Sequence, residues 1–100
     1  MSETTDRQKK TGKDTFLSSL PVITFSTFIA SLNAAVLTQL GVIDEPGTGK
    51  RVKNLMSAKQ TIDILAMLEE KTSGNLTPEE STMLKSILYD LRIIYVRETG

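Results

Sequence analysis

The sequence contains no cysteine, no histidine and no tryptophan. Without cysteine, these 100 residues hold neither a disulfide scaffold nor a thiolate metal site. Without histidine, they lack the commonest general base and the commonest zinc ligand, which excludes Ser-His-Asp, Cys-His and histidine-based metal chemistry within one chain. We therefore expect no enzyme and no cofactor, and we identify no catalytic, cofactor-binding or metal-ligating residue.

The sequence also lacks an excess of either charge. Twelve basic and twelve acidic side chains cancel, so no overall field attracts nucleic acid or anionic lipid. Short basic clusters occur at residues 7–10 (RQKK) and 50–53 (KRVK), but no aromatic residues are interleaved with them. They are weak signals for nucleic-acid binding, and we expect no nucleic-acid partner.

The longest gap in the charge pattern lies between Asp14 and Asp44, because no residue from 15 to 43 is charged. A transmembrane helix needs about 20 mostly apolar residues, whereas Asn33, Gln39 and several Ser and Thr interrupt this segment. A cleaved signal peptide needs a compact apolar region and a small-x-small cleavage site, and no convincing site is found. We expect no transmembrane span and interpret the segment as a helix buried against protein.

The periodicity of apolar residues predicts one all-α domain with three helices. We expect residues 1–22 to be a flexible polar tail and residues 23–98 to be the helical domain. The helices are expected at about 26–40, 57–72 and 78–97. The short connection between the last two predicts an antiparallel hairpin, and the first helix is expected to pack on it.

Local signals mark the starts of two helices. Ser57 is expected to cap the second helix, with Gln60 completing a capping box. Thr77 is expected to cap the third, with Pro78 at the first helical position and Glu80 completing the box. These signals predict the two boundaries to within a residue or two.

Glycines are expected to end the first two helices, at Gly41 and Gly74. The long connection at 42–56 contains Pro46 and Gly47, which predict a type II turn. The sequence leaves open whether this connection also forms a short hairpin.

Residues 47–50, GTGK, resemble part of a phosphate-binding loop. The full pattern needs a glycine at the position of Asp44 and serine or threonine at that of Arg51. No strand–loop–helix context accompanies the segment, so we interpret it as a surface turn.

Apolar residues at helical spacing predict the buried face of each helix. In the first helix these are Phe25, Phe28, Ile29, Leu32, Val36 and Leu40. In the second they are Ala58, Thr61, Ile62, Leu65, Ala66 and Leu68. In the third they are Met83, Leu84, Ile87, Leu88, Leu91, Ile94 and Tyr95.

Two further faces lack charge, and we take them as candidate interfaces. They comprise Thr27, Ser31, Ala34 and Thr38 on the first helix, and Tyr89, Ile93 and Val96 on the third. A helix in a monomeric bundle normally has charged residues on its outer face. We therefore expect a homo-oligomer, a dimer or larger. The alternative is that the tail and the 42–56 connection cover these faces within one chain.

We expect the polar residues of the second and third helices to have structural roles rather than to form a functional pocket. We expect Tyr95 to reach out of the core with its hydroxyl, and Arg92 to pair with a nearby carboxylate. Tyr89 is expected to be a packing residue. Asp63 and Glu69 form no matched acid–base pair by their spacing.

The chain contains three distinctive blocks: FSTFIASL followed by AAVLTQLG, then AKQTIDILAMLEEKTSGNLTPEE, and finally ILYDLRIIYV. On these blocks it resembles a small bacterial family catalogued as domain of unknown function 1844. This chain has Ile87 where the last block of the family begins with leucine. The likeness covers about residues 24–97. The resemblance implies a stand-alone bacterial cytoplasmic protein with residues 24–41 as an integral part of the domain. It implies no activity, substrate or cofactor.

We expect a non-enzymatic module that self-associates and binds a protein partner of unknown identity. A first alternative is a peripheral membrane-surface protein anchored through residues 15–25, TFLSSLPVITF, behind the basic tail. A second alternative is a weak nucleic-acid binder that uses the basic tail and loop.

Overall fold

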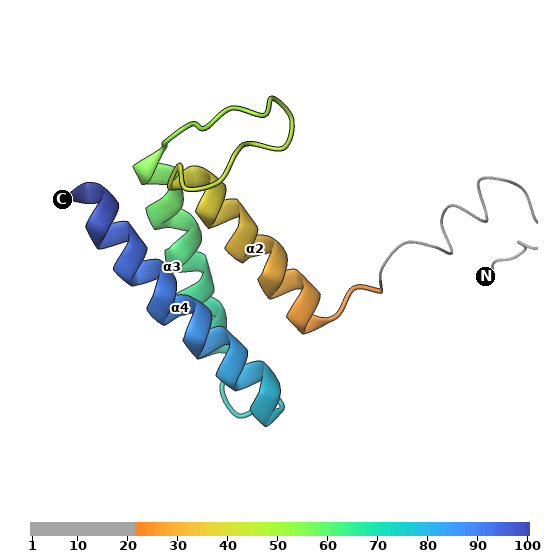
Figure 1. The fold of residues 1–100 in the computed structure, drawn as a ribbon. Coiled ribbons are helices and arrows are strands. Elements are labelled where there is room, and N and C mark those ends of the chain that lie inside the picture. The colour runs from red at the N-terminus through yellow and green to blue at the C-terminus, as the bar shows by residue number, and fades with distance from the viewer. Residues whose placement is uncertain (1–21) are drawn as a thin grey trace, which may run out of the picture.

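The computed structural model describes residues 22–100. They form three helices, α2 (Phe25–Gln39), α3 (Leu55–Lys71) and α4 (Pro78–Thr99), and contain no strand. Every pair of helices is in contact, and α3 runs opposite to both α2 and α4 (Figure 1). The predicted all-α fold with three helices is confirmed. The predicted tail, apart from its last residue, lies outside the described residues.

The start of α2 depends on a pair of threonines. The backbone N–H of Thr27 donates to Thr24 Oγ1 at 3.1 Å, and the N–H of Thr24 donates to Thr27 Oγ1 at 2.8 Å. This reciprocal cap satisfies two amides that a helix end leaves without partners. This cap was not predicted, and the predicted start lies one residue later. α2 has 15 residues, and no helix within residues 22–100 is long and apolar enough to cross a bilayer.

The predicted cap of α3 is wrong. Asn54 is the N-cap, and its Oδ1 accepts a hydrogen bond from the Ser57 backbone N–H at 3.1 Å. The N–H of Asn54 also donates to the carbonyl of Gln39 at 2.7 Å, which ties the connection to the last turn of α2. The earlier start brings Leu55 into the helix, where it packs against the core. Ser57 and Gln60 therefore form no capping box.

The predicted cap of α4 is confirmed. The N–H of Glu80 donates to Thr77 Oγ1 at 3.1 Å, and the N–H of Thr77 donates to Glu80 Oε1 at 2.9 Å. Pro78 occupies the first turn, where a missing N–H costs nothing. The helix continues to Thr99, two residues beyond the predicted end.

Glycine ends the first two described helices as predicted, with φ of 78° at Gly41 and 80° at Gly74. The type II turn predicted at Pro46-Gly47 is wrong, because Gly47 does not have positive φ. Gly49 has φ of 71° instead, and its N–H donates to the Glu45 carbonyl at 2.7 Å. The glycine with positive φ therefore lies two residues later than predicted, and the connection forms no hairpin strands.

The core lies between all three helices. Its buried residues are Ile29, Val36, Leu40, Ala58, Ile62, Leu65, Leu84, Leu88 and Leu91. All of them belong to the predicted faces. Phe28 was also predicted to be buried and is 42% exposed, because it lies at the edge of the apolar arc of α2. The strip of α2 that α3 and α4 cover is narrower than its apolar face.

Thr61 is the buried polar residue of this core. Its Oγ1 lies 3.0 Å from Gln39 Oε1 and 3.0 Å from the Ser57 carbonyl. The hydroxyl is therefore satisfied despite its burial, and it links α3 to the end of α2.

Candidate functional site

The first predicted interface lies on α2, where Thr27, Ser31 and Ala34 are exposed and Thr38 is half-buried. The hydroxyl groups are bonded within the helix. Ser31 Oγ donates to the Phe28 carbonyl at 2.7 Å, and Thr38 Oγ1 donates to the Ala34 carbonyl at 2.9 Å. Because these protons already have acceptors, covering the face leaves no hydroxyl donor without a partner.

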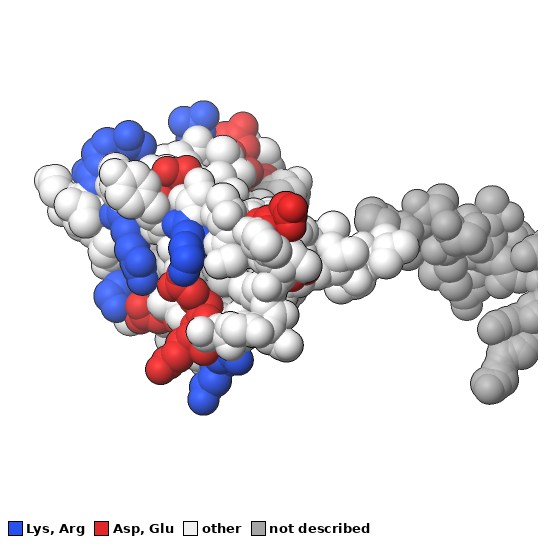
Figure 2. All heavy atoms as spheres, turned by 90° about the horizontal axis from the view of Figure 1, so that it is seen from below, with Lys and Arg blue, Asp and Glu red and all other residues white. Residues whose placement is uncertain are grey.

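The surface around the start of α2 is largely uncharged. Figure 2 shows that most Lys, Arg, Asp and Glu side chains on this side gather away from the N-terminal end of α2, where the surface is mostly white. No residue of α2 is charged. The predicted absence of charge on the outer face is therefore a property of the folded surface.

The second predicted interface lies on α4. Tyr89, Ile93 and Val96 are 68%, 49% and 67% exposed, and they line one open hollow of about 610 Å³. An ion pair between Lys85 and Glu69, at 3.1 Å, borders the same hollow and joins α4 to α3. The structure thus brings the three predicted residues together. None of the lining residues belongs to α2, so the two predicted faces form separate surfaces.

Arg92 lines this hollow and a neighbouring one of about 280 Å³. The sequence analysis predicted that a carboxylate would pair with Arg92. None of the ion pairs within residues 22–100 includes it, so that prediction is wrong for the described part of the chain. The acidic residues of α3 that line these two hollows pair with lysines, Asp63 with Lys59 at 2.9 Å and Glu69 with Lys85 at 3.1 Å. Sequence reasoning missed this unpaired charge because pairing depends on which helix faces which.

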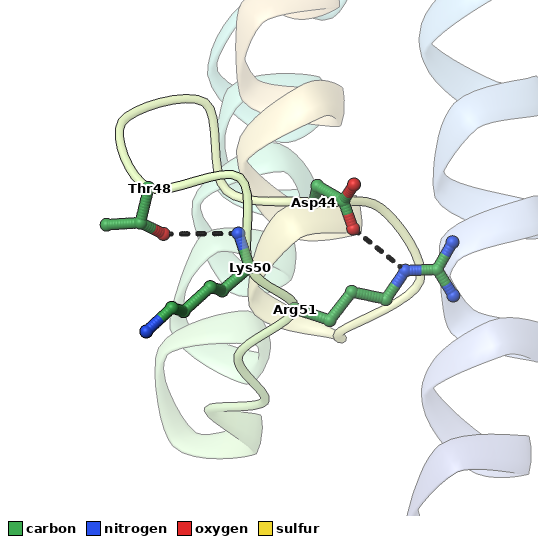
Figure 3. Close-up of polar contacts among 4 residues, drawn as sticks. All are labelled: Asp44, Thr48, Lys50 and Arg51. Atoms are coloured by element: carbon green, nitrogen blue, oxygen red, sulfur yellow. Dashed lines mark hydrogen bonds and ion pairs between the residues drawn. The ribbon is translucent and has the colours of Figure 1, made fainter.

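The backbone amides of Thr48, Gly49 and Lys50, three of the four in the GTGK segment, have hydrogen-bond acceptors. The N–H groups of Thr48 and Gly49 donate to the Glu45 carbonyl, and the N–H of Lys50 donates to Thr48 Oγ1 at 3.3 Å (Figure 3). A phosphate cradle needs free amides at the start of a helix. The next helix begins only at Leu55. This geometry agrees with a surface turn.

The acidic side chains of the described region are dispersed. Within residues 22–100 no cluster of three or more Asp or Glu could hold a metal ion. Asp44, for example, pairs with Arg51 at 3.1 Å in the connection (Figure 3). Four of the described carboxylates, Asp44, Asp63, Glu69 and Glu98, form ion pairs on the surface.

A pH-dependent contact joins the connection to the end of α4. Lys53 Nζ lies 2.7 Å from Glu98 Oε1, and the hydrogen bond from Lys53 lowers the pKa of Glu98 below its usual 4.5. A carboxyl whose pKa is lower in the folded state stabilises the fold above its unfolded-state pKa. That contribution is lost as the pH falls through the folded-state value.

We expect the coupling between Lys53 and Glu98 to be present at neutral pH and weaker in acid, because Glu98 loses its charge as the pH falls through its lowered pKa. The measurement is a double-mutant cycle of Lys53→Gln and Glu98→Gln, followed by urea unfolding at about pH 7 and about pH 3. A coupling energy of the same size at both pH values would contradict the assignment.

Neither the curated proteins nor the solved structures compared with the chain contain a match. The family described as "Domain of unknown function (DUF1844)" matches residues 22–97. This range begins before α2 and ends within the last turn of α4, so the match includes the core and both candidate surfaces. The resemblance inferred from the three sequence blocks is confirmed. The chain belongs to the DUF1844 family.

Proposed function

We propose that this chain is a non-enzymatic helical module that self-associates through the α2 face formed by Thr27, Ser31, Ala34 and Thr38. The observation that supports the proposal is an outward-facing helix without a single charged residue. The outer face of a helix in a monomeric bundle is normally charged. The stripe Tyr89, Ile93 and Val96 on α4 is a separate candidate surface for a protein partner.

The chemistry of the α2 face suits contact between two copies. In a symmetric dimer the same face meets itself, so a charge close to the two-fold axis would meet its own copy. The α2 face avoids this cost, and small side chains such as Ala34 allow the two backbones to approach closely. Burial of apolar surface contributes about 25 cal/mol per Å² before the costs of association are subtracted.

Ala34→Glu is expected to reduce the solution mass from that of a dimer or larger to that of the monomer. It places a carboxylate in the centre of the face, where it meets its symmetry mate and loses hydration. The measurement is light scattering coupled to size exclusion.

Gln60→Glu is the matched control, because it introduces the same group at an exposed position of α3. It is expected to leave the mass unchanged. A monomeric mass for the unmodified chain at micromolar concentration, or an unchanged mass for Ala34→Glu, would refute self-association through α2.

One observation favours the membrane-surface alternative. Val22 and Ile23, the first described residues of the proposed anchor at 15–25, are exposed apolar side chains directly before α2. The remainder of that segment up to residue 21 lies outside the described residues. Liposome co-sedimentation with and without residues 1–23 separates this hypothesis from self-association, and the truncation retains the Thr24 cap.

The contacts of the 42–56 connection argue against the nucleic-acid alternative. Two basic residues of this connection already have acidic partners, Arg51 with Asp44 and Lys53 with Glu98. The basic cluster at 7–10 lies outside the described residues. We therefore rank this hypothesis below the other two.

A further inference from the structure

The outer seam between α3 and α4 contains three adjoining hollows. Their volumes are about 610, 280 and 540 Å³. The first two share Arg92 and Val96, and the last two share Tyr95 and Lys59, so the hollows form a continuous row. Along α4 the row extends from Lys85 to Thr99, about 21 Å at the rise of an α-helix. A helix of about four turns has this length.

The walls of the seam are apolar and exposed. Tyr89, Ile93 and Val96 project from α4, and Met56 of α3, which is 83% exposed, lines the far end. No α2 residue lines any of the three hollows, so α2 leaves this side of the α3–α4 pair uncovered. A row of exposed apolar side chains with a polar border is typical of an interaction surface.

The charges on the border are balanced except at the middle. Lys85 pairs with Glu69 at one end, and Lys59 pairs with Asp63 on the α3 side. Arg92 lies midway between residues 85 and 99, and no described carboxylate pairs with it. Among the described residues, the seam therefore presents one guanidinium group at its centre without an ion-pair partner.

This central charge opposes contact between two copies of the seam. In a symmetric contact centred on the seam, Arg92 of one copy approaches Arg92 of the other, whether the two α4 helices run parallel or antiparallel. Such a juxtaposition of like charges at an interface is unfavourable. A carboxylate from a different protein removes that cost and can form two parallel hydrogen bonds with the guanidinium group.

We propose that the α3–α4 seam binds an amphipathic helix of a partner protein, about four turns long, whose central carboxylate pairs with Arg92. Apolar residues of this helix, spaced three and four apart, cover Tyr89, Ile93 and Val96. This is the helix-in-groove mode of recognition. The seam is separate from the α2 face, so this proposal does not depend on self-association.

The test uses two synthetic helical peptides of about fifteen residues, stapled on the face that points away from the seam. Both have leucine at the seam-facing positions. One has glutamate and the other lysine at the position that meets Arg92. Binding of each fluorescent peptide to the full chain is measured by anisotropy. We expect the glutamate peptide to bind at least about tenfold more tightly than the lysine peptide.

Variants of the chain locate the binding. Arg92→Glu is expected to reverse the preference, and Ile93→Ser is expected to weaken both peptides. Arg97→Glu is the matched control, since it makes the same exchange on α4 outside the three hollows, and it should leave the preference unchanged. These residues are exposed, so circular dichroism should show folded variants.

Equal binding of the two peptides, or a preference that Arg92→Glu leaves unchanged, would overturn the proposal. A fall in solution mass caused by Ile93→Ser would also overturn it, because a second copy would then occupy the seam. Ala34→Glu should leave peptide affinity unchanged while it lowers the mass, so the two proposals fail separately.

Discussion

Leu65→Ala and Leu88→Ala are each expected to lower the free energy of unfolding by about 2–5 kcal/mol. Leu65 of α3 and Leu88 of α4 are 0% and 1% exposed, and both belong to the core between the helices. Truncation removes buried methyl groups and leaves a cavity that the surrounding helices fill only in part. The measurement is urea unfolding followed by circular dichroism.

Ile64→Ala is the matched control for these truncations. Ile64 neighbours Leu65 on α3 but is 42% exposed, so we expect a clearly smaller loss. Domains of this size have a total stability of about 5–15 kcal/mol, which makes either core truncation a large fraction of the whole. Equal losses at Ile64 and Leu65 would contradict the assigned core.

Gly41→Ala is expected to lower the free energy of unfolding by about 1–2 kcal/mol, the usual cost of a left-handed conformation for a residue with a Cβ atom. Gly41 has φ of 78° where α2 ends. A Cβ added there would also lie 3.3 Å from Lys53 Cβ and 3.5 Å from the Val52 carbonyl oxygen. The measurement is the same urea unfolding.

Two other glycines separate the causes of this loss. Gly74 has φ of 80° with open space around an added Cβ, so Gly74→Ala should show the conformational cost alone. Gly47 has neither positive φ nor a close neighbour, so Gly47→Ala should change stability little or increase it slightly. A loss at Gly41 no larger than the change at Gly47 would show that this conformation does not limit stability.

Helix boundaries were predictable where the signal is local. The cap of α4 involves Thr77 and Glu80, which are three residues apart, so the sequence alone contains both partners. The start of α3 was not predictable in this way. Serine and asparagine are both common N-cap residues, so Ser57 and Asn54 were both candidates. Asn54 is the N-cap in the structure, where its backbone N–H also donates to the carbonyl of Gln39 on α2.

The candidate surfaces were likewise predictable only in part. Helical spacing was enough to place Tyr89, Ile93 and Val96 on one face, and the structure brings them together at one hollow. Within residues 22–100 the predicted ion pair of Arg92 is absent, because the charge balance around it depends on how α3 and α4 face each other. Asp63 and Glu69 are both on the adjacent helix, yet each pairs with a lysine instead.

The sequence by itself determined the all-α class, three helices, the residues of the core and the lack of charge on α2. These properties follow from composition and from periodicity within a helix, which depend only on residues close together in the chain. Only the tertiary structure decided that Phe28 is exposed, that Asn54 caps α3, and that a row of hollows lies between α3 and α4. It also decided that Arg92 has no ion-pair partner within residues 22–100. Packing between helices determines these features, because residues distant in the chain become neighbours only after folding.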